Sequence, residues 1–296
     1  MTVAAKSAVD EPGLRPHSEN QRMPAIGYAL WEENLSLLGD PLLTGGEITF
    51  ERVDDPLRLG RYLGGLDLAY ISVHALNLSP ASPEPPARVY LDALLALAEE
   101  NGAAAVSDHL GFTRDGDGGV EIGHFAPPPF TSAALDATCR NLDLIQSHFR
   151  DLPFYLENIA SLFQFRGTMS EAEFLTRVLQ RTGCGWLLDV TNLYANARNH
   201  GYDAAAFLRQ VVPTAPRLQI HLSGGYFDAK AGLYMDSHSR PVPDEVWGLY
   251  RQALELGRGK VDAVFIERDQ DFPDEAGWRA EFRRAHGIAQ AVEAKA

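Results

Sequence analysis

Groups that can bind a metal ion follow several apolar runs of this sequence. The stretch WLLDVTNLYANARNHG, residues 186–201, passes from apolar residues directly to Asp189 and then supplies Asn192 and His200. Other strand-like runs also end in polar side chains that could bind a metal. The strand-end residues of this kind are His74, Asp108, His109, Glu157, Asn158, Asp189, His221 and Glu267. Each one alone could simply cap a helix or bind a loop amide, so the indication of a shared site rests on their number.

The chemistry that this set favours is metal binding. If the strand ends converge, His74, His109 and His221 meet Glu157, Asp189 and Glu267. Burying carboxylates that repel one another without a cation is strongly unfavourable or forces their protonation. Histidine and carboxylate ligands without cysteine favour iron, manganese or zinc over magnesium. One ion uses about four to six ligands, so the set predicts at least two ions bridged by a carboxylate.

A second, outer set of groups lies further along the chain. The predicted loop after the sixth strand supplies Asn192 and His200, and YMDSHSRPV supplies Asp236 and His238, two positions apart. A turn carrying this Asp and His could hold one ion. The alternative for the pair is a surface turn stabilised by the aspartate.

Eight short apolar runs must position these groups. The predicted strands are 24–30, 47–50, 68–74, 103–109, 153–158, 185–191, 217–223 and 261–267. Segments with helical spacing lie between them, most clearly at 87–102, 131–149, 170–183 and 243–257. Strands that alternate with helices predict parallel pairing, and eight such units predict an α/β fold, the (β/α)₈ TIM barrel. Active sites of such barrels lie at the C-terminal ends of the strands, where the polar groups fall.

Local signals agree with the helix boundaries. Thr131, Ser132 and Ser170 stand where a helix N-cap is expected, and Glu173 follows Ser170 by three positions. Gly102 and Gly183 stand where helices should end. The first two units are the least regular, because their helices near 32–39 and 56–64 are short and rich in glycine.

Composition limits the classes of function. The 296-residue chain carries a formal charge of −14, which argues against a nucleic-acid surface built from clustered lysine and arginine. Cys139 and Cys184 have no CxxC partner, so no thiolate zinc site is predicted. Neither a membrane span nor a signal peptide is evident, and we expect a cytoplasmic protein. Residues 1–22 are interpreted as a flexible tail and 23–296 as one barrel domain.

At these residues the sequence resembles the multinuclear iron-dependent oxidases, typified by the methanobactin-biosynthesis oxidase. The resemblance covers roughly residues 68–275. It rests on the order and spacing of SVHALNLS, SDHLGF, PPPFTSAAL, FYLENIASL, LLDVTNLYANARNHGYD, QIHLSGG, MDSHSRPVPDEVWGLYRQAL and FIERDQDFP.

The resemblance implies a xylose-isomerase-like barrel with two or three irons that uses O₂ to modify a ribosomally made precursor peptide, often at cysteine. A separate protein that captures the leader peptide often assists. Central irons would be held by His74, His109, Glu157, Asp189, His221 and Glu267. A further iron would be held by Asn192, His200, Asp236 and His238. Asp108, Asn158 and Arg268 are candidate acid or base groups near the mouth, although Arg268 could instead pair with a structural carboxylate.

The chain also departs from the family pattern. GYALWE, from Gly27, stands where the family usually shows GLR, and SDHL replaces SEHL, which shortens the side chain at Asp108. Gly225 stands where members often place a histidine. These departures concern the substrate and the outcome of the reaction more than the metal ligands.

Two further readings stay open from the residues alone. The same kind of barrel supports divalent-metal isomerases and phosphoesterases, with similar histidine and carboxylate sets. A metal-dependent scaffold that binds a peptide without turnover is the alternative outside the enzymes.

Overall fold

The computed structural model describes residues 23–53, 63, 68–114 and 121–295. The tail predicted at 1–22 and most of the helix predicted near 56–64 lie outside the described residues. Eight parallel strands form the central sheet, in the order β1-β12-β9-β8-β7-β4-β3-β2. They are β1 (Ala25–Tyr28), β2 (Gly45–Thr49), β3 (Tyr70–His74), β4 (Ala105–His109), β7 (Phe154–Glu157), β8 (Gly185–Asp189), β9 (Leu218–Leu222) and β12 (Val261–Ile266). Each lies within or overlaps one of the predicted runs.

The two ends of the sheet, β1 and β2, meet and nearly close it into a barrel. Ala29 forms a parallel bridge with Glu47, and the Leu30 amide donates to the Glu47 carbonyl at 2.8 Å. The close approach requires a glycine, because a Cβ at Gly27 would lie 1.9 Å from the Gly45 carbonyl oxygen. The predicted (β/α)₈ fold is confirmed.

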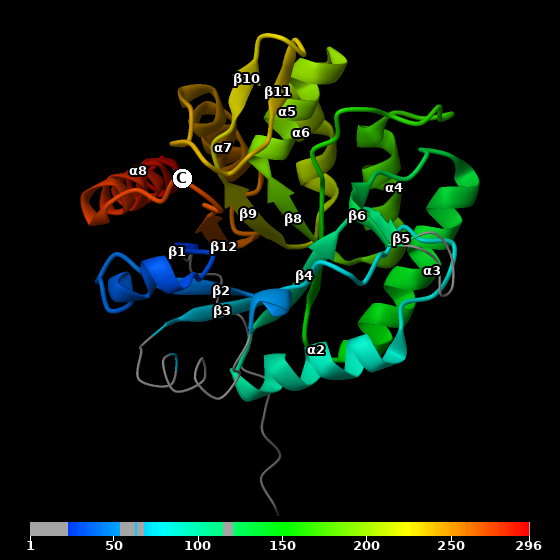
Figure 1. The fold of residues 1–296 in the computed structure, drawn as a ribbon, viewed down its shortest axis with the longest axis horizontal. Coiled ribbons are helices and arrows are strands. Elements are labelled where there is room, and N and C mark those ends of the chain that lie inside the picture. Colours follow the sequence, from blue (N-terminus) through cyan, green and yellow to red (C-terminus); the bar gives the residue numbers. More distant parts are fainter. Residues whose placement is uncertain (1–22, 54–62, 64–67, 115–120, 296) are drawn as a thin grey trace, which may run out of the picture.

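Helices surround the sheet in chain order (Figure 1). They are α2 (Arg88–Glu100), α3 (Ser132–Phe149), α4 (Glu171–Thr182), α5 (Val190–His200), α6 (Ala204–Val211), α7 (Asp244–Leu256) and α8 (Glu275–Glu293). Short 3₁₀ segments are η1 (Glu32–Leu37), η2 (Phe50–Arg52) and η3 (Val212–Thr214). Two hairpins, β5 (Phe112–Arg114) with β6 (Glu121–Ala126) and β10 (Tyr226–Asp228) with β11 (Leu233–Met235), follow the C-terminal ends of β4 and β9.

The predicted boundaries of α3 and α4 are confirmed by their caps. Thr131 Oγ1 accepts from the Ala134 amide at 3.3 Å, and Ser170 Oγ accepts from the Glu173 amide at 3.1 Å. Gly183 ends α4 in the left-handed conformation, which glycine adopts without strain.

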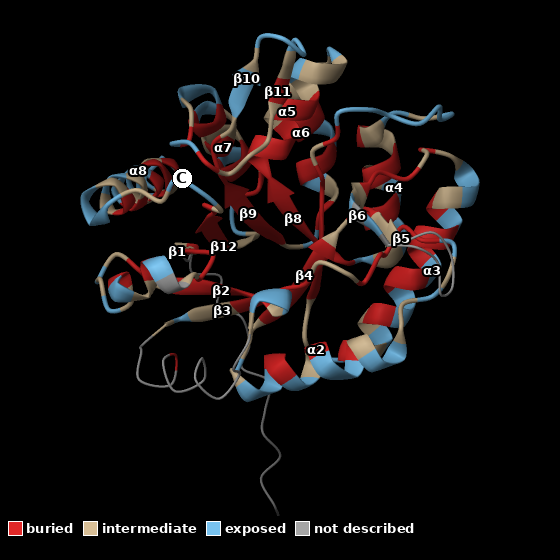
Figure 2. Ribbon diagram, in the orientation of Figure 1, coloured by how far each residue is buried: buried red, intermediate tan, exposed pale blue. Residues whose placement is uncertain are grey.

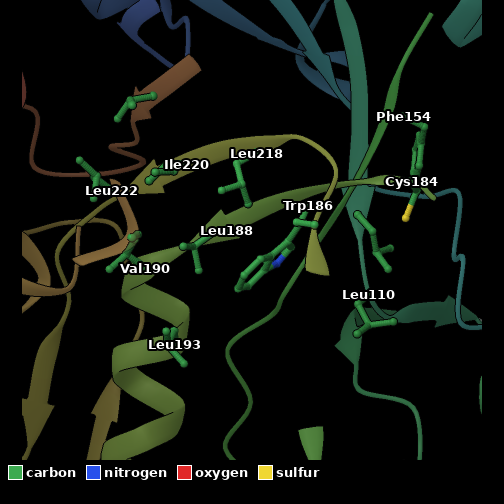
Figure 3. Packing of buried hydrophobic residues seen from close by; sticks show 14 of the residues in the cluster. Leu110, Phe154, Cys184, Trp186, Leu188, Val190, Leu193, Leu218, Ile220 and Leu222 are labelled. Atoms are coloured by element: carbon green, nitrogen blue, oxygen red, sulfur yellow. The ribbon is translucent and has the colours of Figure 1, made fainter. Parts of the chain in front are cut away.

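The segment after β8 is a helix and not the predicted loop. The Asp189 carboxylate caps α5 by accepting from the Asn192 amide at 2.7 Å. Val190 and Leu193 of this helix belong to the same hydrophobic core as Leu188 of β8 (Figure 3). The residue that caps α5 is therefore also a candidate metal ligand.

Burial follows the expected barrel pattern. The strands of the central sheet are largely buried, while the helices bury one face and expose the other (Figure 2). Both cysteines, Cys139 and Cys184, lie in the core, apart from the strand-end groups. Among the described residues, no helix is both long enough and apolar enough to span a bilayer.

Candidate metal centre

The carboxylate at the end of β7 lies close to the histidines that end β3 and β4. Glu157 Oε2 lies 3.5 Å from His74 Nε2 and 3.4 Å from His109 Nε2. One possible ligand atom from each of the three residues lies within 4.8 Å of the others. This spacing is compatible with a shared metal ion.

A second group shares Glu157 with residues from β8, β9 and the end of β12. Glu157, Asp189, His221 and Glu267 offer ligand atoms that all lie within 4.8 Å of one another. His221 Nδ1 lies 3.4 Å from Glu157 Oε1 and 3.1 Å from Glu267 Oε2. The six strand-end residues expected to hold central ions are thus brought into two groups that meet at Glu157.

The other nitrogen of each β3 and β4 histidine has a partner outside the centre. His74 Nδ1 lies 2.9 Å from Ser107 Oγ, and His109 Nδ1 lies 3.3 Å from Asp108 Oδ1. Asp108 is fixed in turn, because its Oδ2 accepts from the Leu78 amide at 2.7 Å. Such contacts hold a ring so that its remaining nitrogen faces a metal.

Asn158 braces the backbone of Asp189. Asn158 Nδ2 donates to the Asp189 carbonyl at 2.9 Å, and Asn158 Oδ1 accepts from the Asp189 amide at 3.1 Å. The side-chain Nδ2 of Asn192 donates to the Asn158 carbonyl at 3.0 Å. Asn192 Oδ1 and Asp189 Oδ2 stay buried without a hydrogen-bond partner.

Asp236 and His238 lie beside the second group. His238 Nε2 is 3.1 Å from Asp236 Oδ1, and His238 Nδ1 is 3.5 Å from both Glu267 Oε2 and Asp269 Oδ2. His238 has a φ of 47°, a left-handed conformation that is costly for a residue with a side chain. The strained backbone directs the imidazole toward Glu267.

His200 and Arg268 are placed differently. His200 ends α5, eight residues after Asn192 and thus about 12 Å along the helix axis, and its Nε2 lies 2.8 Å from the Ser161 carbonyl. Arg268 is 2% exposed and pairs with Glu281 of α8 at 3.1 Å. The structure gives Arg268 the carboxylate partner that the sequence left open.

Burial keeps the β3 and β4 histidines neutral. It lowers the pKa of His74 and the pKa of His109 to about 3. At neutral pH each of these rings therefore keeps one nitrogen lone pair that a metal ion could use. Burial raises the pKa of Glu157 to about 7 and the pKa of Asp108 to about 8.

The second group has the opposite balance of charge. Burial acts to lower the pKa of His221, but the carboxylates of Glu267, Glu47 and Glu157 together raise it well above its ordinary value. Burial acts to raise the pKa of Glu267, but His221 and His238 outweigh it and hold that pKa below its ordinary value. Burial, followed by the Asp236 carboxylate, raises the pKa of Asp189 well above its usual range.

Many polar atoms of the centre are buried without a hydrogen-bond partner. These atoms are Glu47 Oε1 and Oε2, Glu157 Oε2, Asp189 Oδ2, Asn192 Oδ1, His221 Nδ1 and Nε2, Asp236 Oδ1, His238 Nε2 and Glu267 Oε2. Buried polar groups are normally paired, and clusters of unpaired lone pairs mark places where a cation fits. The donors are nitrogen and oxygen only, which suits iron, manganese or zinc.

Sequence reasoning missed three contributors. Glu47 is fully buried on β2 beside His221, Ser107 contacts His74, and Asp269 contacts His238. The signal for Glu47 was a carboxylate within the apolar EITF run, and that for Asp269 was its position two residues after Glu267. Ser107 had no signal of its own.

Gly225 is explained by the β10–β11 hairpin. A Cβ at position 225 would lie 2.0 Å from the Met235 carbonyl oxygen. The Gly225 amide also donates to Tyr234 Oη at 2.9 Å. The hairpin leaves no room for a histidine at this position.

Several solved structures share the fold of this chain. The chain superposes on a D-tagatose 3-epimerase-like protein with a TM-score of 0.59 and 17% identity, over 92% of this chain and 99% of that one. A xylose isomerase-like TIM barrel protein from Mycobacterium smegmatis in complex with magnesium gives 0.55 and 17%, over 88% of each chain. Endonuclease IV from Thermus thermophilus gives 0.53 and 18%, over 92% and 100%. These likenesses establish the xylose-isomerase-like barrel.

Sequence relatives carry the more specific information. A UPF0276 protein of Rhizorhabdus wittichii is 39% identical over 221 residues, which cover 75% of this chain and 77% of the relative. A UPF0276 protein of Caulobacter vibrioides is 38% identical over 204 residues, covering 69% and 70%. Residues 59–290 match the family model described as RiPP precursor modification enzyme MbnB/TglH/ChrH, where RiPP denotes a ribosomally made, modified peptide. The chain therefore belongs to the MbnB/TglH/ChrH family of RiPP precursor modification enzymes.

Proposed function

We propose that this protein is a multinuclear iron-dependent oxidase that uses O₂ to modify a residue of a precursor peptide, often cysteine in this family. The observation that carries the proposal is the meeting of two groups of histidines and carboxylates at Glu157. A carboxylate with one oxygen toward each group is suited to bridge two cations. Family membership supports the peptide as the substrate class.

The central ions would be held by the six strand-end residues. These are His74, His109, Glu157, Asp189, His221 and Glu267. Bound iron would supply Lewis acidity and one-electron redox chemistry with O₂, which no side chain of this site can supply.

The surrounding residues orient these ligands. Ser107 and Asp108 hold His74 and His109, and Asn158 holds the backbone of Asp189. We therefore give Asp108 and Asn158 positioning roles in place of proton transfer. Arg268 would anchor the end of β12, next to Glu267, to α8.

An outer ion would use Asp236, His238 and Asn192 Oδ1. Asp236 and His238 already face each other, and Asn192 Oδ1 has no other partner. His200 would join this site only after its ring leaves the Ser161 carbonyl. The outer ion therefore depends on groups less constrained than the central set.

The working assembly would include two peptide-related partners. One is the precursor peptide itself. The other is a separate protein that captures the leader segment and brings the modified residue to the C-terminal face of the barrel.

Oxygen uptake tests the proposal. Protein loaded with ferrous iron without air is mixed with synthetic peptides encoded by short reading frames beside the gene, and O₂ consumption and peptide mass are followed together. We expect O₂ uptake coupled to a mass change, and neither in a Glu157→Gln control. Peptide left unchanged and no O₂ uptake by fully loaded protein would reject the oxidase. Turnover of a ketose or phosphodiester without O₂ would favour the isomerase or phosphoesterase reading.

A further inference from the structure

Glu47 is a buried carboxylate in close contact with a candidate metal ligand. Its side chain and that of His221 are both 0% exposed, and Glu47 Oε1 lies 2.9 Å from His221 Nε2. Neither Glu47 oxygen has a hydrogen-bond partner in the described part of the chain. Burial of a carboxyl group is unfavourable unless the group is paired, and the His221 ring is the group within pairing distance.

The sheet register places Glu47 below the layer of candidate ligands. Glu47 of β2 pairs with Ser72 of β3, while His74 pairs with Thr49 two positions further along. Glu47 belongs to neither of the two groups that could hold an ion. Among the described residues, only the His221 ring lies within ion-pair distance of Glu47. The other nitrogen of that ring faces Glu157 and Glu267.

The other two central histidines show the same division of their nitrogens. His74 and His109 turn Nε2 to Glu157 and give Nδ1 to Ser107 and Asp108. His221 is inverted, with Nδ1 toward the centre and Nε2 toward Glu47. The outward partner of His221, like that of His109, is a carboxylate, the strongest acceptor available to a ring N–H.

We propose that Glu47 is a positioning residue that keeps the proton of His221 on Nε2 and so presents the Nδ1 lone pair to a metal ion. This inference rests on the proposed metal centre. The close pair is not aligned as a hydrogen bond in the structure, so a rotation of the ring toward Oε1 would complete the N–H···O contact. A carboxylate behind a metal-bound histidine fixes both the tautomer and the ring orientation.

Zinc provides a diamagnetic probe for the test. A crystal structure of the zinc-loaded, full-length protein should show His221 bound through Nδ1 at about 2.1 Å. Two-bond ¹⁵N–¹H spectra of histidine-labelled zinc protein, with His221 assigned by its loss in His221→Ala, should show the proton on Nε2. Zinc bound to Nε2 of His221 would overturn the proposal while leaving the metal centre intact. A chain that takes up no zinc would overturn both the role of Glu47 and the metal centre.

Substitutions then measure the effect on affinity. Glu47→Leu should weaken zinc binding about 10–100-fold, whereas Glu47→Gln should weaken it less because its amide oxygen still accepts from Nε2. Glu171→Gln is the matched control, since Glu171 contacts Tyr202 and Asn196 and no candidate central ligand. Equal affinity of wild type and a folded Glu47→Leu variant would count against the proposal. If neither Glu47 variant folds, the zinc-bound nitrogen of wild-type His221 decides alone.

The outcome is separable from the oxidase proposal. Zinc held by Nδ1 of His221, in a protein whose iron form consumes no O₂, would support Glu47 and reject the oxidase. O₂ uptake coupled to peptide modification, by a protein whose His221 binds zinc through Nε2, would support the oxidase and reject the role of Glu47.

Discussion

Glu157 Oε1 lies 3.4 Å from His221 Nδ1, while the second oxygen of the same carboxylate faces His74 and His109. One side chain at the end of β7 therefore belongs to both groups of candidate ligands. A change at Glu157 should affect both groups, whereas a change at a ligand of one group should act more locally.

Glu157→Gln should fold and lose nearly all iron. The amide keeps the volume of the side chain but removes the negative charge that would offset the proposed cations. We expect iron below about 10% of wild type, measured by elemental analysis, with unchanged circular dichroism. Glu171→Gln, which alters a carboxylate outside the centre, should keep its iron. A folded Glu157→Gln protein with near-normal iron would remove Glu157 from the ligand set.

The purified protein should carry iron at about two or more ions per chain, because the six strand-end ligands fall into two groups that share only Glu157. Elemental analysis after iron-replete expression without air measures the content. Zinc or magnesium alone under these conditions would contradict the oxidase proposal.

The barrel could be predicted because each strand is a short apolar run and four helices carry clear signals. Asp189 combines the two roles that a strand-end residue could have, helix cap and metal ligand. Its Oδ1 caps α5, as a structural residue would, while Oδ2 stays buried without a partner in the centre. The sequence offered these roles as alternatives, and one carboxylate has an oxygen for each.

Other features depend on packing that a single sequence does not reveal. The segment 190–200 is rich in asparagine, which disfavours helix interiors, yet it forms α5 because Asp189 caps it and Leu193 packs in the core. A loop could bring Asn192 and His200 to one ion, whereas α5 places them at opposite ends of a helix. The role of Glu47 depends on the register of a five-residue strand and on the rotamer of His221.

Asp189→Asn should stabilise the metal-free protein and weaken metal binding. Asparagine caps a helix as well as aspartate does, so the cap on α5 survives. Burial, followed by the Asp236 carboxylate, raises the pKa of Asp189, so the metal-free fold disfavours its ionised form. Removing this cost should raise the free energy of unfolding by about 1–2 kcal/mol without metal. Denaturant unfolding with and without added iron measures both effects.

The control for this substitution is Asp203→Asn, which alters the cap of α6 away from the centre. It should change stability by less than about 0.5 kcal/mol with or without iron. If Asp189→Asn destabilises the metal-free chain, the carboxylate is chiefly structural.

Stability should depend on pH through Glu171. Burial raises the pKa of Glu171 from 4.5 to about 7. Between these values the unfolded chain releases a proton that the folded chain keeps. Stability from this group is therefore present below about pH 4.5, falls as the pH rises to about 7, and then levels off. Between these pH values the free energy of unfolding of wild type should fall by on the order of 1–3 kcal/mol more than that of Glu171→Gln.

Unfolding of the two metal-free proteins at pH 5 and pH 8 measures this difference, because all other groups titrate alike in both. Wild type should lose more stability than Glu171→Gln between the two values. Parallel behaviour would show that the Glu171 carboxylate is solvated.

His238→Ala should remove one ion and leave the central ones. His238 and Asp236 follow a hairpin and do not end a strand, so their site should be less preorganised and bind more weakly. Mild chelation of the wild type should release the same ion first. Iron content before and after stepwise chelation measures both effects.

Ser237→Ala is the matched control, because Ser237 lies between Asp236 and His238 and contacts Ser239. Unchanged iron in His238→Ala would identify residues 236–238 as a structural turn, whereas loss of all iron would mean that the contact with Glu267 couples every ion into one cooperative cluster.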